Sequence, residues 1–324
     1  MKLAIVVPVA PFESEKALRE SIEHVKALSK NFDCKIVYVI DKNSNFDERI
    51  RTARSLGVEV IEREGRRGKR AGAINDAVKY LINYSPDFVL ILDIDSRTDE
   101  KTISNCISAL SNSRESYIAS AKRCIYNSSS LISQTIEFEY KLINFLLKKS
   151  PFKQFNGLIG LVRFENLLEG LREDAIAEDA DFATRMHAKG LKALIVDGAF
   201  FEQAPLSWKD FYRQRKRWYY GGLQLWRYRR EMAKAEKKVR LSWYLALTVT
   251  YFPLLILPFL PFIVFAFLFY YRKISKLKVV VGLFIYSLIL QLSAISALMD
   301  YLRKKEVEWN AIRRASFDST NSSR

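Results

Sequence analysis

The first part of the chain alternates short apolar runs with segments whose apolar residues recur every three or four positions. The short runs are residues 3–9, 34–40, 58–62 and 88–92, and the helix-like segments are 13–29, 46–56 and 71–82. Short apolar runs are typical of buried strands, and the longer periodicity is typical of helices. The alternation predicts an α/β fold with a mostly parallel, Rossmann-like sheet that has helices on both faces.

Acidic residues stand where two of these strands end. Asp41 follows the run 34–40, and Asp93 and Asp95 follow the run 88–92. Ligands of parallel sheets bind at the carboxyl ends of the strands, so we expect these acids to mark a site. No GxGxxG follows the first strand and the sequence has no GxxxxGK[ST], which argues against a dinucleotide dehydrogenase and a P-loop protein.

One residue separates Asp93 from Asp95, so in extended chain both carboxylates point to the same side. Two hard oxygen ligands suit Mg²⁺ or Mn²⁺. Such an ion would neutralise the charge on a departing nucleotide diphosphate. Structural alternatives stay open, because a D-x-D pair can simply end a strand and Asp41 can cap the next helix through an Asx turn.

A second acidic pair, Glu178 and Asp179, precedes apolar residues at helical spacing. The spacing predicts a helix that begins near the pair, and the helix dipole alone favours acids there. The chemical alternative is that Asp179, with Glu178 as its neighbour, is a general base. It would take the proton from a sugar hydroxyl that attacks an activated anomeric carbon.

Two long runs without charged residues follow residue 240. Residues 241–271 and 279–299 each reach the roughly 20 residues that a helix needs to cross a bilayer. Three prolines in the first run predict a kink there. We expect two membrane spans with both ends in the cytoplasm, from the flanking basic residues. A re-entrant hairpin followed by one span is the alternative.

Basic and aromatic residues alternate just before the first of these runs, in residues 206–240. This pattern is expected of an amphipathic helix at a membrane surface. The formal net charge is +16, and most of the excess lies beside the apolar runs, which favours anionic lipid over nucleic acid as the partner. The 3 cysteines lie far apart, so we expect neither a disulfide nor a zinc site.

Five motifs occur in order along the chain. They are VVPV with VIDKNSNFD (6–9 and 39–47), RAGAIN (70–75), DID (93–95), AED (177–179) and QRKRW (214–218). With these motifs the chain resembles, over residues 3–230, the membrane-bound family 2 glycosyltransferases, which include cellulose, chitin and hyaluronan synthases and polyprenyl-phosphate sugar transferases. The resemblance implies a GT-A fold and an inverting, single-displacement transfer from a UDP- or GDP-sugar with the help of Mg²⁺ or Mn²⁺.

The resemblance also implies roles for individual residues. Asp179 would be the catalytic base with Glu178 beside it, and Asp95 with Asp93 would hold the metal. The implied donor-binding residues are Pro8, Asp41 (at the nucleobase), Arg70, Asn75, Asp93, Gln214, Arg217 and Trp218. The implied acceptor-side residues are Phe155, Asn156, Gly157 and Trp218. The chain departs from the family pattern at Lys42, Arg70 and Ala177, where a second acid, Lys and Thr are usual.

The expected organisation has four parts. Residues 1–205 form a GT-A catalytic domain, 206–240 an interfacial segment, 241–300 a transmembrane region and 301–324 a basic polar tail. No secretory signal precedes the first strand, so we expect the catalytic domain on the cytoplasmic side of a multi-pass cell-membrane protein.

The acceptor stays open at this stage. QxxRW favours extension of a membrane-associated polysaccharide, whereas two or three spans enclose little of a polar channel unless a homo-oligomer or a partner subunit adds to it. Single-step transfer to a polyprenyl phosphate or a lipid-linked glycan is the alternative. A catalytically inactive, nucleotide-sugar-binding membrane scaffold is the alternative without chemistry.

Overall fold

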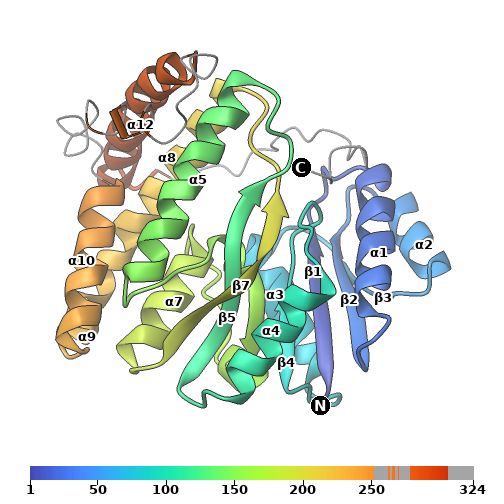
Figure 1. The fold of residues 1–324 in the computed structure, drawn as a ribbon. Coiled ribbons are helices and arrows are strands. Elements are labelled where there is room, and N and C mark those ends of the chain that lie inside the picture. Colours follow the sequence, from blue (N-terminus) through green and yellow to red (C-terminus); the bar gives the residue numbers. More distant parts are fainter. Residues whose placement is uncertain (252–261, 263–264, 267–268, 270–277, 306–324) are drawn as a thin grey trace.

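The computed structural model describes residues 1–251, 262, 265–266, 269 and 278–305. Its centre is a 7-stranded sheet with the strand order β3-β2-β1-β4-β6-β5-β7 (Figure 1). The strands are β1 (Leu3–Val9), β2 (Cys34–Asp41), β3 (Glu59–Arg63), β4 (Phe88–Ile91), β5 (Ser116–Ile125), β6 (Gly160–Arg163) and β7 (Lys192–Glu202). The pairs β1–β2, β1–β4, β2–β3 and β5–β7 are parallel, and β6 runs antiparallel to both β4 and β5. The predicted mostly parallel α/β sheet is therefore confirmed.

Helices cover both faces of this sheet, because alternate residues of its strands point to opposite sides. Leu3 and Ile5 of β1 pack with Leu18 in one core, while Ala4 and Val6 pack with the helices of the other core. The first core lies under α1 (Glu15–Ser29), α2 (Glu48–Ser55) and α4 (Glu100–Ser111). The second lies under α3 (Lys69–Leu81), α6 (Phe164–Leu167) and α7 (Glu178–Ala188).

The N-terminal cap of α2 shows whether Asp41 caps this helix. Asp47 is the residue that caps α2, and its Oδ1 accepts a hydrogen bond from the backbone N–H of Arg49 at 3.1 Å. Asp41 instead ends β2. The alternative that Asp41 caps this helix is therefore wrong.

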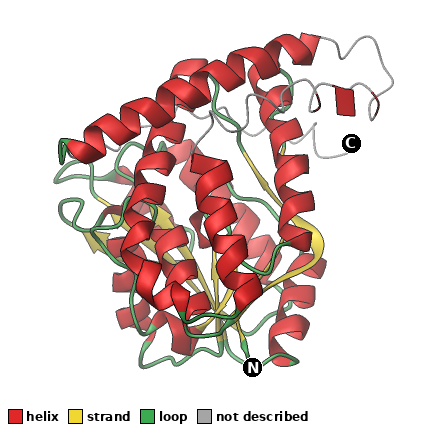
Figure 2. Ribbon diagram, turned by 90° about the vertical axis from the view of Figure 1, so that its left-hand side faces the viewer, coloured by secondary structure: helices red, strands yellow, loops and turns green. Residues whose placement is uncertain are grey.

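The remaining helices gather at one side of the domain (Figures 1 and 2). They are α5 (Leu131–Lys149), η1 (Asn156–Leu158), α8 (Trp208–Gln224), η2 (Leu225–Tyr228), α9 (Arg229–Ala233), α10 (Lys237–Tyr251) and α12 (Lys278–Leu302). The helix α8 packs along α12 and also contacts α7 and α10. Lys216 of α8 pairs with Asp300 of α12 at 2.5 Å, and the Tyr212 hydroxyl donates to Ser296 Oγ at 2.7 Å.

The expected membrane region is described only in part. In the part of the chain that the structure describes, the one helix with the length and apolar composition of a membrane span is Val281–Leu302, within α12. It coincides with the predicted run 279–299. The first predicted run starts in α10, and the rest of it, with its three prolines, lies outside the described residues apart from a few isolated positions.

Candidate active site

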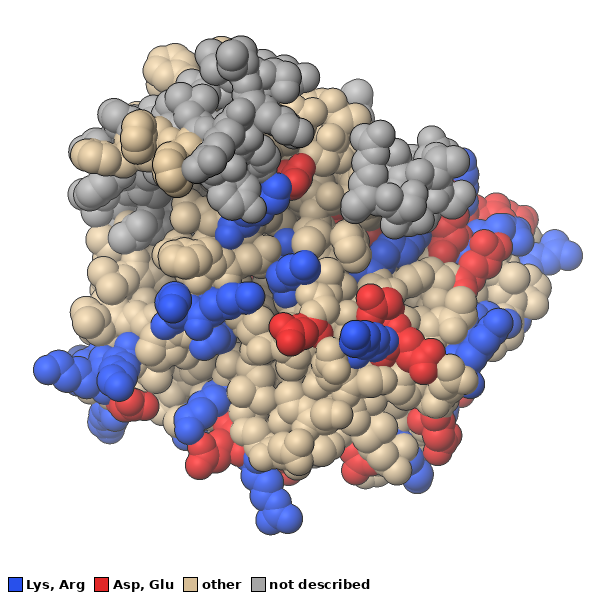
Figure 3. Space-filling model, in the orientation of Figure 1, with Lys and Arg blue, Asp and Glu red and all other residues tan. Residues whose placement is uncertain are grey.

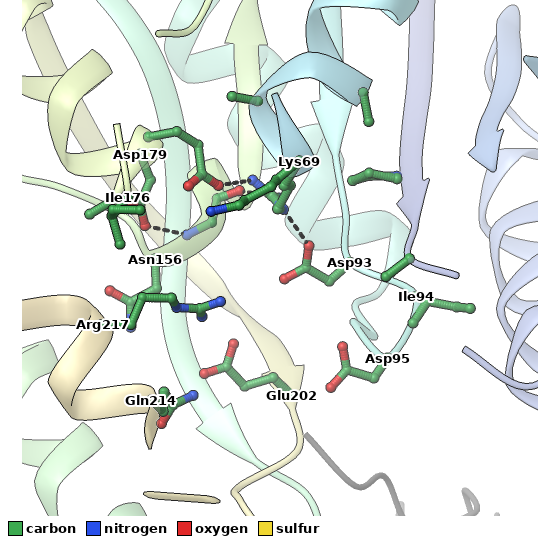
Figure 4. A pocket seen from close by; sticks show the side chains of 18 of the residues that line it. Lys69, Asp93, Ile94, Asp95, Asn156, Ile176, Asp179, Glu202, Gln214 and Arg217 are labelled. Carbon is green, nitrogen blue, oxygen red and sulfur yellow. Dashed lines mark hydrogen bonds and ion pairs between the residues drawn. The ribbon is translucent and has the colours of Figure 1, made fainter. Parts of the chain in front are cut away.

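A cavity of about 550 Å³ opens where the carboxyl ends of the strands meet. Its walls come from the ends of β1, β2, β5 and β7, the turn after β4, and the first turns of α3 and α7. One face of α8 closes it on the side that carries QRKRW. Figure 4 shows that these side chains point inward from segments far apart in the sequence.

Most of the residues that the sequence singles out line this cavity. They are Pro8, Asp41, Arg70, Asp93, Asp95, Asn156, Gly157, Glu178, Asp179, Gln214, Arg217 and Trp218. The metal-binding candidates and the candidate base thus share one space, although more than 80 positions of sequence separate them.

Two predicted residues do not reach the cavity. The Asn75 side chain holds the loop after α6: its Nδ2 donates to Leu171 O at 2.9 Å, and its Oδ1 accepts from Leu171 N at 2.7 Å. Phe155 is buried in the core beneath α3. Neither Asn75, expected to bind the donor, nor Phe155, expected on the acceptor side, lines the cavity, because both side chains support its wall from outside.

The carboxylates of Asp93 and Asp95 lie at one end of the cavity, close to Glu202 (Figure 4). A tight turn sets their direction, in which Ser96 N donates to Asp93 O at 2.9 Å and Ser96 Oγ accepts from Asp93 N at 3.1 Å. Asp95 Oδ2 accepts from Gln203 N at 3.4 Å. The carboxylate oxygens of Asp93 and Asp95 are hard ligands, so they fit Mg²⁺ or Mn²⁺.

Within the described residues, no group of three or more His, Cys, Asp or Glu side chains is arranged to enclose an ion. A cation on Asp93 and Asp95 would therefore take its other ligands from water and from substrate oxygens, as Mg²⁺ commonly does.

The candidate base is held by two backbone N–H groups. Asp179 Oδ2 accepts from Gly157 N at 2.6 Å, and Oδ1 accepts from Ala180 N at 2.8 Å. Gly157 adopts a φ of 66°, which a side chain would disfavour, and an added Cβ would lie 3.3 Å from both Arg70 Nη2 and Asp93 Oδ2. The glycine of the FNG motif thus lets the backbone approach the acids closely.

Arg70 joins the two acidic groups. Its Nε donates to Asp93 Oδ1 at 2.9 Å, its Nη1 donates to Glu178 Oε1 at 3.0 Å, and its Nη2 donates to the Gly157 carbonyl. Burial opposes the charge on Arg70, yet the carboxylates of Asp93 and Glu178 raise its pKa overall. Burial and the neighbouring Asp179 raise the pKa of Glu178, and Arg70 acts in the opposite direction.

The helix α8 both lines the cavity and binds to the rest of the domain. Arg217 and Trp218 follow Gln214 by three and four positions, and all three side chains line the cavity, as one helix face does. Arg217 points into the space near Glu202 (Figure 4). Arg215 does not line the cavity. It is buried, its guanidinium lies 4.1 Å from the centre of the Trp218 ring, and it pairs with Glu139 of α5 at 2.5 Å. This ion pair anchors QRKRW to the domain.

Several cavity residues escaped the sequence reasoning, and Arg123, Tyr140 and Glu202 form one cluster among them. Arg123 and the Tyr140 hydroxyl both bind the Glu202 carboxylate, and Arg123 Nη1 donates to Asn156 O at 3.0 Å. Arg123 and Glu202 lie at the carboxyl ends of β5 and β7. The rule that selected Asp41 would have found them had those two strands been identified in the sequence.

At the opposite end of the cavity, Asp41 is almost fully buried. Its Oδ1 accepts from Arg63 Nη1 at 2.8 Å. Burial raises the pKa of Asp41 to about 6, although Arg63, Arg66 and Arg49 act to lower it.

Comparison with known protein families gives two overlapping matches. Residues 88–294 match the family model described as glycosyl transferase family group 2, and residues 5–164 match the one described as glycosyl transferase family 2.

Among curated proteins, glucomannan 4-beta-mannosyltransferase 1 of Oryza sativa subsp. japonica is 24% identical over 240 residues, which cover 69% of this chain and 46% of that protein. Glucomannan 4-beta-mannosyltransferase 9 of Arabidopsis thaliana is 22% identical over 242 residues, which cover 69% of this chain and 45% of that protein. The chain spans about half the length of the curated relatives it matches.

Two solved structures share the fold. A mannosyltransferase from Pyrobaculum calidifontis, in complex with GDP-Man and Mn²⁺, superposes with a TM-score of 0.65 at 18% identity and covers 94% of this chain and 88% of that one. S. aureus TarS 1-349 superposes with a TM-score of 0.52 at 15% identity and covers 96% and 94%. At these identities the likeness concerns the GT-A-like fold.

Proposed function

The chain belongs to glycosyl transferase family group 2 and is a glycosyltransferase, and from this premise we propose that it transfers a mannosyl residue from GDP-mannose to a membrane-associated glycan. The observation that carries the proposal is the shared cavity of Asp93, Asp95 and Asp179. Its volume is within the usual range for small-molecule sites. The choice of mannose and guanine is supported by the names of the relatives and of the Pyrobaculum calidifontis complex.

In this mechanism the acceptor hydroxyl attacks the anomeric carbon in one displacement. A bond forms between the acceptor oxygen and that carbon, the bond from carbon to the diphosphate oxygen breaks, and the hydroxyl proton moves to Asp179. Gly157 N–H and Ala180 N–H hold the base in place. A divalent ion on Asp93 and Asp95 would stabilise the charge of the departing diphosphate. Arg217 adds a fixed positive charge to the same cavity.

We also propose that the acceptor arrives from a membrane at the α12 side of the cytoplasmic domain. Large apolar side chains are exposed along one stripe of α12, at Val281, Phe284, Leu288, Leu292, Ile295 and Met299. Lys and Arg side chains gather over α9 and α10 (Figure 3). The stripe and the basic residues lie at different heights of the same side of the domain (Figure 1), which supports contact of that side with anionic lipid.

Purified protein in detergent tests the proposal. GDP-mannose, GDP-glucose, UDP-glucose and UDP-N-acetylglucosamine are each supplied with Mn²⁺ and a membrane lipid extract, and the products are sized. We expect GDP-mannose to be consumed. A ladder of products would identify a polysaccharide acceptor, and a single lipid product would identify a one-step acceptor. Turnover of a UDP-sugar in place of GDP-mannose would contradict the proposed donor.

A further inference from the structure

Two buried arginines stand behind the Asp41 end of the cavity and are not among the residues that line it. Arg63 ends β3 and Arg49 lies in α2, and their side chains are 5% and 3% exposed. A buried guanidinium is costly unless its N–H groups are all matched by acceptors. Where each N–H goes therefore indicates what the residue holds in place.

The N–H groups of Arg63 reach four acceptors from three segments. Nε pairs with Asp76 Oδ2 at 2.9 Å, Nη1 donates to Asp41 Oδ1 at 2.8 Å and to Lys69 O at 3.1 Å, and Nη2 donates to Arg67 O. The fork thus ties the Asp41 carboxylate to the carbonyls of the loop that leads into α3. This loop supplies Arg66, Gly68 and Lys69 to the cavity wall.

The loop needs such support, because its backbone is strained. Gly68 and Lys69 have φ values of 63° and 50°, and for a residue with a side chain this region costs about 1 to 2 kcal/mol. Arg63 binds the carbonyl of the strained Lys69.

The first turn of α3 also packs closely against Arg63, at Gly72. A Cβ on Gly72 would lie 2.1 Å from Arg67 O and 2.8 Å from Arg63 Nη2. The glycine of the RAGAIN motif is therefore required by the close fit of α3 against the Arg63-bound loop.

We propose that Arg63 is a positioning residue for the nucleotide, whose guanidinium fixes the Asp41 carboxylate and the 66–69 loop in the geometry that receives the base and diphosphate of the donor. This inference rests on the proposed function in that the donor is a nucleotide diphosphate sugar. Lysine cannot replace Arg63, because a single ammonium point charge does not span acceptors on three segments.

Arg49 provides a comparison within the same region. Its Nη1 donates to Ala10 O at 2.7 Å and to Glu13 O at 3.1 Å, and its Nη2 donates to Asp41 O at 2.8 Å. Arg49 thus binds the backbone carbonyl of Asp41, whereas Arg63 binds its carboxylate.

The difference leads to a pH signature. The charged groups that act on Asp41 are Arg63, Arg66 and Arg49, which lower its pKa, and Asp76, which raises it. An ionised Asp41 accepts N–H groups of the base, so affinity falls as pH drops through the pKa of about 6. Loss of Arg63 removes the largest lowering influence and moves this fall to higher pH.

The test measures, by calorimetry between pH 5 and 8.5, the affinity of GDP and UDP for the detergent-purified full chain. The kcat is measured separately at saturating donor. Arg63→Gln is expected to weaken nucleotide binding roughly 10- to 100-fold at pH 7.5. It is also expected to move the fall of affinity at low pH, the acidic limb of the titration, to higher pH. The change in kcat should be smaller than the change in affinity. Arg63→Lys is expected to keep the weakened binding. The matched control is Arg54→Gln, an exposed arginine of α2 that pairs with Glu62.

Wild-type nucleotide affinity and an unmoved acidic limb in Arg63→Gln would overturn the inference. So would a loss of kcat with unchanged affinity. If Arg63→Gln fails to fold, the same titration of Arg63→Lys decides, and wild-type affinity there also overturns the inference. If the unsubstituted chain binds neither GDP nor UDP, the proposed function fails instead.

Discussion

The two ends of the cavity are built in different ways. The nucleotide end, proposed to receive the nucleotide, consists of Asp41, Arg63 and the 66–69 loop, and its ion pairs join residues that lie within 35 positions of each other. The transfer end, proposed to carry out the transfer, consists of Arg70, Asp93, Asp95, Gly157, Glu178 and Asp179, which meet only in the folded chain. At the first end, the side chains are therefore already held in place by ion pairs and hydrogen bonds. At the second end, Arg70 occupies carboxylate oxygens that substrate and metal would also use.

The sharpest test of this contrast is the candidate base. Asp179→Asn keeps the size of the side chain and removes its ability to take a proton. We expect kcat to fall about 10²- to 10⁴-fold, the usual contribution of a general base, while the affinity for GDP stays unchanged. Initial rates and calorimetry measure the two quantities. Unchanged turnover would remove Asp179 as the base.

Arg70 tests whether the transfer end works as one unit. Arg70→Gln is expected to lower kcat by up to about 10²-fold, because Gly157 and Glu178 lose the group that aligns them with Asp93. Arg70→Lys should recover part of this loss. Arg19→Gln, at an exposed pair on α1, is the control. A rise in KM with kcat preserved would instead assign Arg70 to donor binding alone.

The metal prediction concerns Asp95. Asp95→Ala is expected to lower the affinity for Mn²⁺ in the presence of GDP by about 10- to 100-fold, as measured by calorimetry. Affinity for GDP should then become independent of chelator. If GDP binds the unsubstituted protein equally well with and without EDTA, Asp93 and Asp95 do not hold a metal that bridges to the diphosphate.

The smallest expected effect lies at the nucleotide end. The pKa of Asp41 is raised to about 6, so the ionised form is the major one above pH 6 and is lost below it. We expect the affinity for GDP to be level above pH 7 and to fall about tenfold per unit well below pH 6. Asp41→Asn should bind weakly at every pH. An acidic limb that persists in Asp41→Asn would assign the titration to another group.

The sequence indicates the nucleotide end and the first four strands more fully than the rest. Strands β1 to β4 and helices α1 to α3 begin and end within two residues of the predicted ranges, because their apolar periodicity and flanking turns are local signals. Most of the residues that the motifs select then line the cavity. Asn75 is instructive: it stands in the RAGAIN motif, yet only the fold reveals that its side chain binds the backbone of Leu171 and does not line the cavity.

What the sequence misses depends on contacts across long stretches of chain. Arg63 carries no motif of its own and has no place in the cavity, so its link to Asp41 appears only when β3 lies beside β2. Glu202 and Arg123 meet because β7 pairs with β5, two strands more than 60 positions apart. Burial of such polar groups depends on partners that no local window contains.

The reversed direction of β6 has a further consequence for how this enzyme can diversify. Because β6 runs against β4, with Gly160 opposite Ile91, the segment that leads into β6 arrives at the rim where the other strands finish. The part of the cavity wall that contains the FNG motif (155–157) therefore belongs to the stretch between α5 and β6. Lengthening or shortening that stretch would reshape the opening of the cavity while Asp93 and Asp41 keep their positions.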